Sequence, residues 1–393
     1  MARKSKGRLS GRATSRVHLA FLALSILIPL AALSLQVARL HPFVDDVNAT
    51  TSRHDDWLNY KRFASSVVDD GLEMPAVRGN YARPGGILYP YFVALVFSVF
   101  GENSAWVYIV QGTLIAIGIV VMAWAFRDRL SEPIALVALM VLAVYCYLDV
   151  FRWYSQKLLS ENLLYAVIPW FFLALLKARD LQSKSWITVA GVILGLAVLT
   201  RPNVLAAGLL ILALILIYFR SQPRVAITLA TWFLIGFVGG QLPLFVRNVV
   251  VTGKVTLGTF SPAFQTTHDW LDRDQHDPIE IQPIDREQRP VYYYVDRTLY
   301  TLGVTEYGLV YRWVVMNLLI GVLVVACMKH RSIEFGDAAL FAFTISYLGP
   351  LILFAAIRTY GVRMVLPIIP IHVVLAFRGL TSIRSLFTRK QEQ

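Results

Sequence analysis

The sequence is poor in charge and in cysteine. Asp, Glu, Lys and Arg make up 16% of its 393 residues, and its two cysteines, Cys146 and Cys327, both lie inside apolar blocks. This placement favours packing of the thiols as small apolar groups and argues against a disulfide framework or a thiolate metal site. Hydrophobic residues make up 56% of the chain, and they gather in blocks of roughly 15 to 22 residues, the length that spans hydrocarbon. The sequence therefore predicts an all-α polytopic membrane protein.

The net charge of +12 is carried mainly by the tails and the short loops. This distribution argues against nucleic-acid binding and instead orients the helices, because basic residues favour the cytoplasmic side. We expect about ten transmembrane helices within a membrane domain over residues 18–380. The expected spans are His18–Val37, Trp106–Phe126, Pro133–Val150, Leu158–Leu176, Trp186–Leu199, Val204–Tyr218, Val225–Val246, Gly308–Met328, Ala338–Ile357 and Met364–Phe377.

The basic residues of the loops alternate consistently if both ends of the chain are cytoplasmic. The basic segment 1–17 and the tail 381–393 then lie inside, and two long polar segments, 41–105 and 247–307, lie outside. This alternation requires that the apolar stretch Ile87–Phe100 does not cross the membrane. At about 14 residues it is short for a crossing, so we expect a juxtamembrane helix that lies along the outer face or re-enters it. The first span is expected to be an anchor rather than a cleaved signal, because the basic start is long and lacks a small-residue cleavage site.

The first outer segment brings acidic and basic groups to the membrane surface. Asp55 and Asp56 precede a helical pattern, and Arg83 stands before Pro84, where the chain returns to the membrane. In one interpretation, a carboxylate takes a proton from an acceptor hydroxyl while the guanidinium steadies a phosphate, which indicates transfer from a lipid-linked phosphosugar. In the other, Asp55 is a helix N-cap and Asp56 a first-turn acid without chemistry. The residues that predict the helix are Trp57, Tyr60, Phe63, Ala64 and Val67.

Further polar side chains stand at the outer ends of the expected spans. Burying a polar side chain in a membrane is costly, so such residues indicate a functional site. Glu161 adds a carboxylate, and four arginines add forked donors that suit phosphate oxygens, although an individual arginine at such a position more often extends to lipid headgroups. These arginines are Arg201, Arg247, Arg358 and Arg363. The second outer segment is rich in His and Asp, including His268, but their spacing fits no tight metal-ligand pattern and favours a solvated acidic loop.

Several short motifs follow one another along the chain. They are Asp56-Trp57-Leu58-Asn59-Tyr60, Arg83-Pro84, Tyr89-Pro90, Leu159-Ser160-Glu161, Gly195-Leu196-Ala197-Val198-Leu199-Thr200-Arg201-Pro202, Arg247-Asn248 and Arg363-Met364-Val365-Leu366-Pro367. Their order resembles that of the C-type (GT-C) membrane glycosyltransferases, specifically the bacterial aminoarabinose transferase and protein O-mannosyltransferase branch, glycosyltransferase family 39 type. The resemblance covers nearly the whole hydrophobic region and lies in the order of the motifs rather than in any one of them.

The resemblance implies a set of site residues. In that family an aspartate of the first outer loop is catalytic; this role falls on Asp56, with Asp55 as the alternative base. A lysine-proline element of the family matches Arg83-Pro84, which implies that Arg83 binds phosphate. Glu161 matches an acidic position of the second outer loop, where it would position the acceptor or help to hold a divalent cation. Substrate binding is assigned to Tyr60, Arg83, Tyr89, Arg201, Arg247, His268, Arg358 and Arg363.

The function expected from the resemblance is transfer of a sugar from a polyprenyl-phosphate donor to a hydroxyl of a lipid, glycan or protein acceptor. The reaction would take place on the outer face of the plasma (inner) membrane. The sugar, the acceptor, the metal ligands and any need for a divalent cation stay open, and the early end of the chain indicates a compact member. Two other classes also stay open. A transporter or lipid flippase would show related halves, of which we find no convincing sign, and a non-catalytic subunit of an envelope-assembly complex would not need Asp55 and Asp56.

Overall fold

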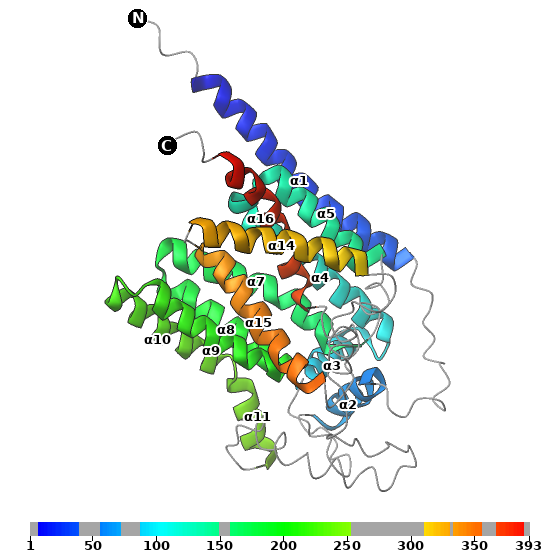
Figure 1. Ribbon diagram of the computed structural model, residues 1–393. Coiled ribbons are helices and arrows are strands. Elements are labelled where there is room, and N and C mark those ends of the chain that lie inside the picture. Colours follow the sequence, from blue (N-terminus) through cyan, green and yellow to red (C-terminus); the bar gives the residue numbers. More distant parts are fainter. Residues whose placement is uncertain are drawn as a thin grey trace, which may run out of the picture.

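The protein is helical throughout the part of the chain that its structure describes. The computed structural model describes residues 7–38, 56–71, 87–148, 158–252, 310–330, 333–355 and 367–388, and no strand occurs among them (Figure 1). The helices are α1 (Gly7–Ala38), α2 (Asp56–Asp70), α3 (Leu88–Phe100), α4 (Ser104–Leu130), α5 (Glu132–Leu148), α7 (Ser160–Leu181), α8 (Lys184–Thr200), the 3₁₀ turn η1 (Pro202–Val204), α9 (Leu205–Tyr218), α10 (Pro223–Gly239), α11 (Leu242–Thr252), α14 (Val310–His330), α15 (Phe335–Ala355) and α16 (Ile369–Thr388).

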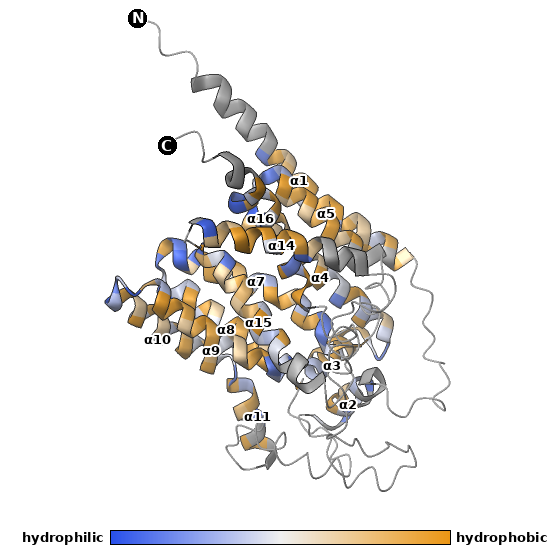
Figure 2. Cartoon of the chain, in the orientation of Figure 1, coloured by the Kyte–Doolittle hydropathy of each residue, from blue (hydrophilic) through white to orange (hydrophobic). Residues whose placement is uncertain are grey.

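The walls of this bundle are apolar enough for a lipid bilayer. Four stretches among the described residues have the length and hydropathy of a membrane crossing: His18–Leu35, Ser104–Leu130, Ser160–Leu181 and Pro223–Arg247. Figure 2 shows hydrophobic residues along the bodies of the helices and hydrophilic residues mainly towards their ends. In such helices the backbone polar groups are hydrogen-bonded within the helix, and the apolar side chains face the hydrocarbon. The chain is therefore a membrane-embedded protein.

Helix α7 lies inside the bundle and α1 lies at its edge. Of the residues in the apolar window of α7, 78% are buried in the protein, against 28% for the window of α1. Helix α7 packs against both α4 and α8, whereas α1 packs mainly on α5. Residues presented at the ends of α7 are consequently held by neighbours on several sides.

Helices α8 and α10 approach each other through glycines. A Cβ atom added to Gly191 of α8 would overlap the carbonyl oxygen of Phe233, and one added to Gly236 of α10 would overlap that of Thr188. Small residues allow helix backbones to come close in a membrane, where packing and polar contacts drive association. The glycines therefore set the distance between α8 and α10. The carboxyl end of α8 leads directly to Arg201.

A second, smaller apolar core attaches α2 and α3 to one end of the bundle. Ala64 of α2 and Tyr89, Val93 and Phe97 of α3 are buried there, together with Leu163 at the start of α7. Helix α3 ends at Phe100 and is followed by Gly101, whose φ of 83° is easily reached by glycine. Because α2 and α3 pack on each other and on the ends of longer helices, they form an attached layer at this end.

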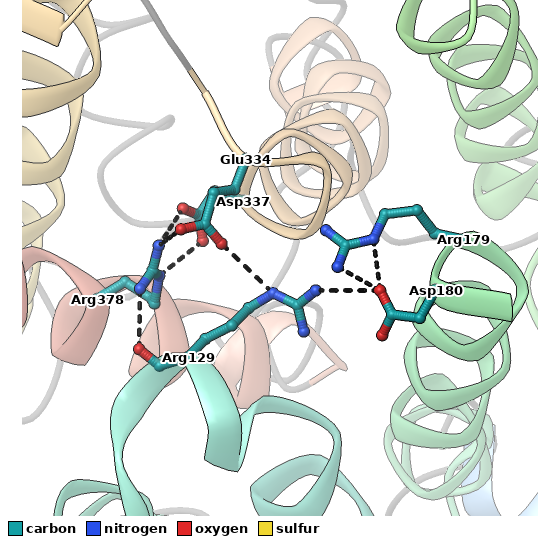
Figure 3. A network of polar contacts seen from close by, with 6 residues as sticks. All are labelled: Arg129, Arg179, Asp180, Glu334, Asp337 and Arg378. Atoms are coloured by element: carbon teal, nitrogen blue, oxygen red, sulfur yellow. Dashed lines mark hydrogen bonds and ion pairs between the residues drawn. The ribbon is translucent and has the colours of Figure 1, made fainter. Parts of the chain in front are cut away.

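The opposite end of α7 belongs to a network of arginines and carboxylates (Figure 3). Arg378 of α16 donates to both carboxylate oxygens of Asp337, at 3.0 and 2.9 Å, and to the carbonyl oxygen of Arg129, at 2.9 Å. Arg129 lies 3.5 Å from Glu334 and 4.0 Å from Asp180, which also pairs with Arg179. We call these six residues the arginine network. It ties the ends of α4 and α7 and the start of α15 to the middle of α16.

Each of the ten expected spans overlaps a helix of the structure, but the number of membrane crossings stays a prediction. The helix expected at Ile87–Phe100 is present as α3, and the amphipathic helix expected from Asp56 onwards is present as α2. One expected span, Val225–Val246, differs in detail because the backbone divides into α10 and α11 around Gly240 and Gln241. The two helices still form one apolar stretch in sequence.

Candidate functional site

Two tyrosines form the side of the site that belongs to α2 and α3. Tyr60 stands on α2, one helical turn after Asp56, the first residue of that helix. The ring of Tyr60 meets that of Tyr89 edge to face, with centroids 4.9 Å apart and an interplanar angle of 78°. The Tyr89 side chain is fully buried, and its hydroxyl donates to Oε1 of Gln111 in α4 at 2.9 Å. Gln111 thereby fixes Tyr89, and Tyr89 supports Tyr60.

A buried ion pair forms the opposite side of the site. Glu161 lies in the first turn of α7, where a helix N-terminus stabilises negative charge, and the residue is 0% exposed. Arg201 follows the last residue of α8 and precedes Pro202. Because a residue before proline disfavours helical backbone angles, Arg201 is extended, with φ −150° and ψ 112°. Its guanidinium pairs with the Glu161 carboxylate, and its side chain is 20% exposed.

Ser160 joins these two sides. The Tyr60 hydroxyl donates to Oγ of Ser160 at 3.2 Å, and the Ser160 hydroxyl donates to Oε2 of Glu161 at 3.2 Å. We call Tyr60, Ser160, Glu161 and Arg201 the polar chain. It runs from the surface layer formed by α2 into the bundle, and Tyr347 of α15, fully buried, lies close enough to interact electrostatically with the ion pair at its end.

Arg247 is brought to the same end of the bundle. Its Nε donates to the hydroxyl of Tyr91 at 3.2 Å, which links α11 to α3 two residues after Tyr89. The Arg201 side chain is 20% exposed, and its buried Nε has no hydrogen-bond partner among the described residues. Two guanidiniums at one end of an apolar bundle suit an anionic group at the membrane surface.

The structure brings together a definite subset of the residues expected from the sequence. Tyr60, Tyr89, Glu161 and Arg201 share one site, and Arg247 contacts the helix that carries Tyr89. Asp56 is placed as the first residue of α2. The remaining expected residues, Asp55, Arg83, His268, Arg358 and Arg363, lie outside the described residues.

Sequence reasoning did not assign a role to Ser160, Gln111 or Tyr347. Each is a polar residue within or at the end of an apolar stretch, and the cost of burying a polar group in a membrane protein is the signal that could have identified them. The question of a metal stays open. No group of three or more His, Cys, Asp or Glu side chains that could hold a metal occurs within the described ranges, and the Glu161 carboxylate faces Arg201 there.

Comparison with known proteins identifies the fold. Residues 83–246 match the family described as dolichyl-phosphate-mannose-protein mannosyltransferase. The crystal structure of ArnT from Cupriavidus metallidurans bound to undecaprenyl phosphate is similar over 92% of this chain and 60% of that chain, with 14% identity and a TM-score of 0.56. The chain has the fold of a GT-C glycosyltransferase. This finding confirms the resemblance that the order of the motifs predicts.

Archaeal structures share the GT-C fold as well. The oligosaccharyltransferase AglB from Archaeoglobus fulgidus, in complex with an inhibitory peptide and a dolichol-phosphate, is similar over 95% of this chain and 52% of that chain, with 13% identity and a TM-score of 0.55. The A. fulgidus oligosaccharyltransferase in complex with Zn and sulfate matches with 16% identity and a TM-score of 0.53, over 91% of this chain and 51% of that one. The present chain thus spans between half and 60% of these longer proteins. A search of curated protein sequences found no significant match.

Proposed function

We propose that the protein is an integral membrane glycosyltransferase. It transfers a sugar from a polyprenyl-phosphate donor to a hydroxyl group of a lipid, glycan or protein acceptor on the non-cytoplasmic face. The observation that carries this proposal is the placement of α2: the helix that begins with Asp56 is attached through Tyr60 to a buried Glu161–Arg201 pair at one end of an apolar bundle. The same fold holds lipid-linked phosphates in ArnT and AglB.

The proposed reaction needs a base for the acceptor and cations for the leaving group. Asp56 takes the proton of the acceptor hydroxyl, whose oxygen forms a bond to the anomeric carbon of the sugar. The bond between that carbon and the phosphate oxygen breaks, and the electron pair leaves with the polyprenyl phosphate. Arg83 stabilises the phosphate charge, with Arg201 and Arg247 as further cations near the bundle end. Asp55 is the alternative base.

Glu161 acts in this proposal through Arg201. Its carboxylate is buried and faces the guanidinium, so it holds Arg201 in place, while part of that side chain, which is 20% exposed, stays accessible to an anion. A phosphate that meets a positioned guanidinium avoids the entropy cost of ordering a free arginine side chain. In this role Glu161 holds Arg201 in place and does not contact the reacting carbon.

Transfer can be tested with purified protein, radiolabelled undecaprenyl-phosphate sugars and a lipid-extract acceptor. Asp56→Asn preserves the size of the side chain and removes its charge, so we expect turnover to fall roughly a hundredfold or more, the scale of losing a general base. Asp69→Asn, an exposed acid on the same helix, is the matched control and should retain turnover. Loss of turnover in Asp55→Asn instead would move the base by one residue.

Other outcomes would replace the proposal. Movement of the labelled lipid across a vesicle membrane without transfer would identify a flippase. Absence of both activities in the purified protein, with full function of an Asp55→Asn/Asp56→Asn variant in cells, would identify a non-catalytic subunit.

A further inference from the structure

Helix α2 depends on tertiary contacts for its position. It has 15 residues, and an isolated helix of that length is marginally stable in water. Ala64 packs it into the small core shared with α3, and the ring of Tyr60 rests against Tyr89. These apolar contacts attach α2 to the layer, but they tolerate some rotation about the helix axis because they are not directional.

The hydrogen bonds of the polar chain are directional. Ser160 has one hydroxyl proton, which it donates to the Glu161 carboxylate, so its oxygen is oriented to accept from Tyr60. Ser160 and Glu161 are both 0% exposed, and Arg201 pairs with Glu161 at the inner end. A buried charged pair thus sets the direction of each hydroxyl in turn, and in a low-dielectric environment such bonds strengthen one another.

We infer that Tyr60 and Ser160 are positioning residues whose hydroxyl groups set the rotation of α2, and so the position of Asp56, relative to the Glu161–Arg201 pair. This inference rests on the proposed function and names how the base is aligned. Asp56 stands one turn before Tyr60 on the same helix. A rotation of about 20° would move a group some 5 to 6 Å from the helix axis by roughly 2 Å, and misplacement of reacting groups by about 1 Å can cost a hundredfold in rate.

Turnover of single and double variants tests this alignment. Tyr60→Phe keeps the ring that contacts Tyr89 and removes the hydroxyl, while Ser160→Ala removes the other half of the link. We expect each variant to lower kcat about tenfold, with the KM for the donor within about twofold of its original value, because as a positioning residue Tyr60 does not contact the donor, in contrast to the substrate-binding role expected from the sequence. The double variant should be no slower than the slower single variant, because both changes remove the same link.

Ser65→Ala is the matched control, since the Ser65 hydroxyl makes an exposed hydrogen bond from the same helix to Glu102, at 3.0 Å. It should leave kcat unchanged. A double variant of Tyr60→Phe and Ser160→Ala that loses the product of the two single effects would show independent roles and overturn the inference. A change confined to KM would make Tyr60 a substrate contact and would also overturn it.

A second readout needs no catalytic activity. Spin labels at Val68 of α2 and Val144 of α5, both exposed, report the position of α2 against the bundle. Tyr60→Phe and Ser160→Ala should shift or broaden the distance distribution, and Ser65→Ala should not. If the unmodified protein proves inactive, the proposed function fails while this measurement still decides the positioning role. An unchanged distribution in both hydroxyl variants would overturn the inference.

Discussion

Replacing Arg201 with glutamine removes the cation that faces the Glu161 carboxylate inside the protein. The carboxylate is completely buried, so the loss leaves a charge in a region from which water is excluded. Breaking a buried ion pair by removing one partner costs about 3 to 5 kcal/mol. The Arg201 side chain is 20% exposed, so water can reach the vacated position in part, and we expect the free energy of unfolding to fall by about 3 kcal/mol, the lower end of that range.

Removal of both charges should behave differently. In the variant Glu161→Gln/Arg201→Gln the amide at 161 can still accept the hydrogen bond of Ser160, and no buried charge is left unpaired. We expect its free energy of unfolding to lie within about 1 kcal/mol of the original value, so that the double-mutant cycle shows a coupling of at least about 2 kcal/mol.

Denaturant unfolding of the protein in detergent micelles measures these two variants and the single variant Glu161→Gln that completes the cycle, and transfer from a labelled undecaprenyl-phosphate sugar measures their function. The double variant should be folded yet impaired in transfer, because the positioned cation is gone. The reasoning is refuted if Arg201→Gln is as stable as the unmodified protein, since the pair would then not compensate a buried charge. It is also refuted if the double variant is as unstable as Arg201→Gln, since the decrease in the free energy of unfolding would then come from lost packing rather than from an unpaired charge.

Three further results are expected. Arg83→Ala should weaken binding of undecaprenyl phosphate by about 1.5 to 3 kcal/mol and Arg83→Lys should recover part of it, whereas unchanged affinity would move the phosphate site to other arginines. Gly236→Ala should lower the free energy of unfolding by about 1 to 3 kcal/mol through overpacking against α8, whereas Gly239→Ala, with open space around its Cβ, should not, and equal effects would contradict the close-packed interface. In a cysteine-free background, Cys at Gln275 should react with an impermeant thiol reagent in intact cells and Cys at Ser183 should not; reaction at Ser183 alone would reverse the proposed orientation.

The sequence was sufficient to predict α2 because that helix carries its pattern locally. Its apolar residues recur at the spacing of one helix face, and an acid stands in the first turn. The same holds for the ends of the long helices, where a charged residue such as Glu161 or Arg201 is conspicuous against its apolar neighbours. In each case the residue and the sequence pattern that predicts it lie within a few positions of one another.

The contacts between these residues could not be predicted from local sequence patterns. Nothing in the local pattern links Tyr60 to Ser160, one hundred residues later, or places Arg201 against Glu161. Those contacts depend on how α2, α7 and α8 pack together in the folded protein, which is set by contacts between helices rather than by helix formation. The division between α10 and α11 also escaped prediction, because both segments are apolar and hydropathy does not register a break in the backbone.

The two polar clusters at the ends of α7 differ in composition, and from this difference we expect an anionic ligand to bind at the end that carries α2. In the arginine network every arginine faces a carboxylate, and Arg378 also caps the carbonyl of Arg129 (Figure 3). This set of three arginines and three carboxylates is suited to holding α4, α7, α15 and α16 together. At the other end the ion pair is buried on its acidic side and partly open on its basic side, and a second guanidinium, Arg247, lies against α3. We therefore expect a phosphate to bind at the end that carries α2, near Arg201 and Arg247, while α7, packed against α4 and α8, connects that end to the arginine network.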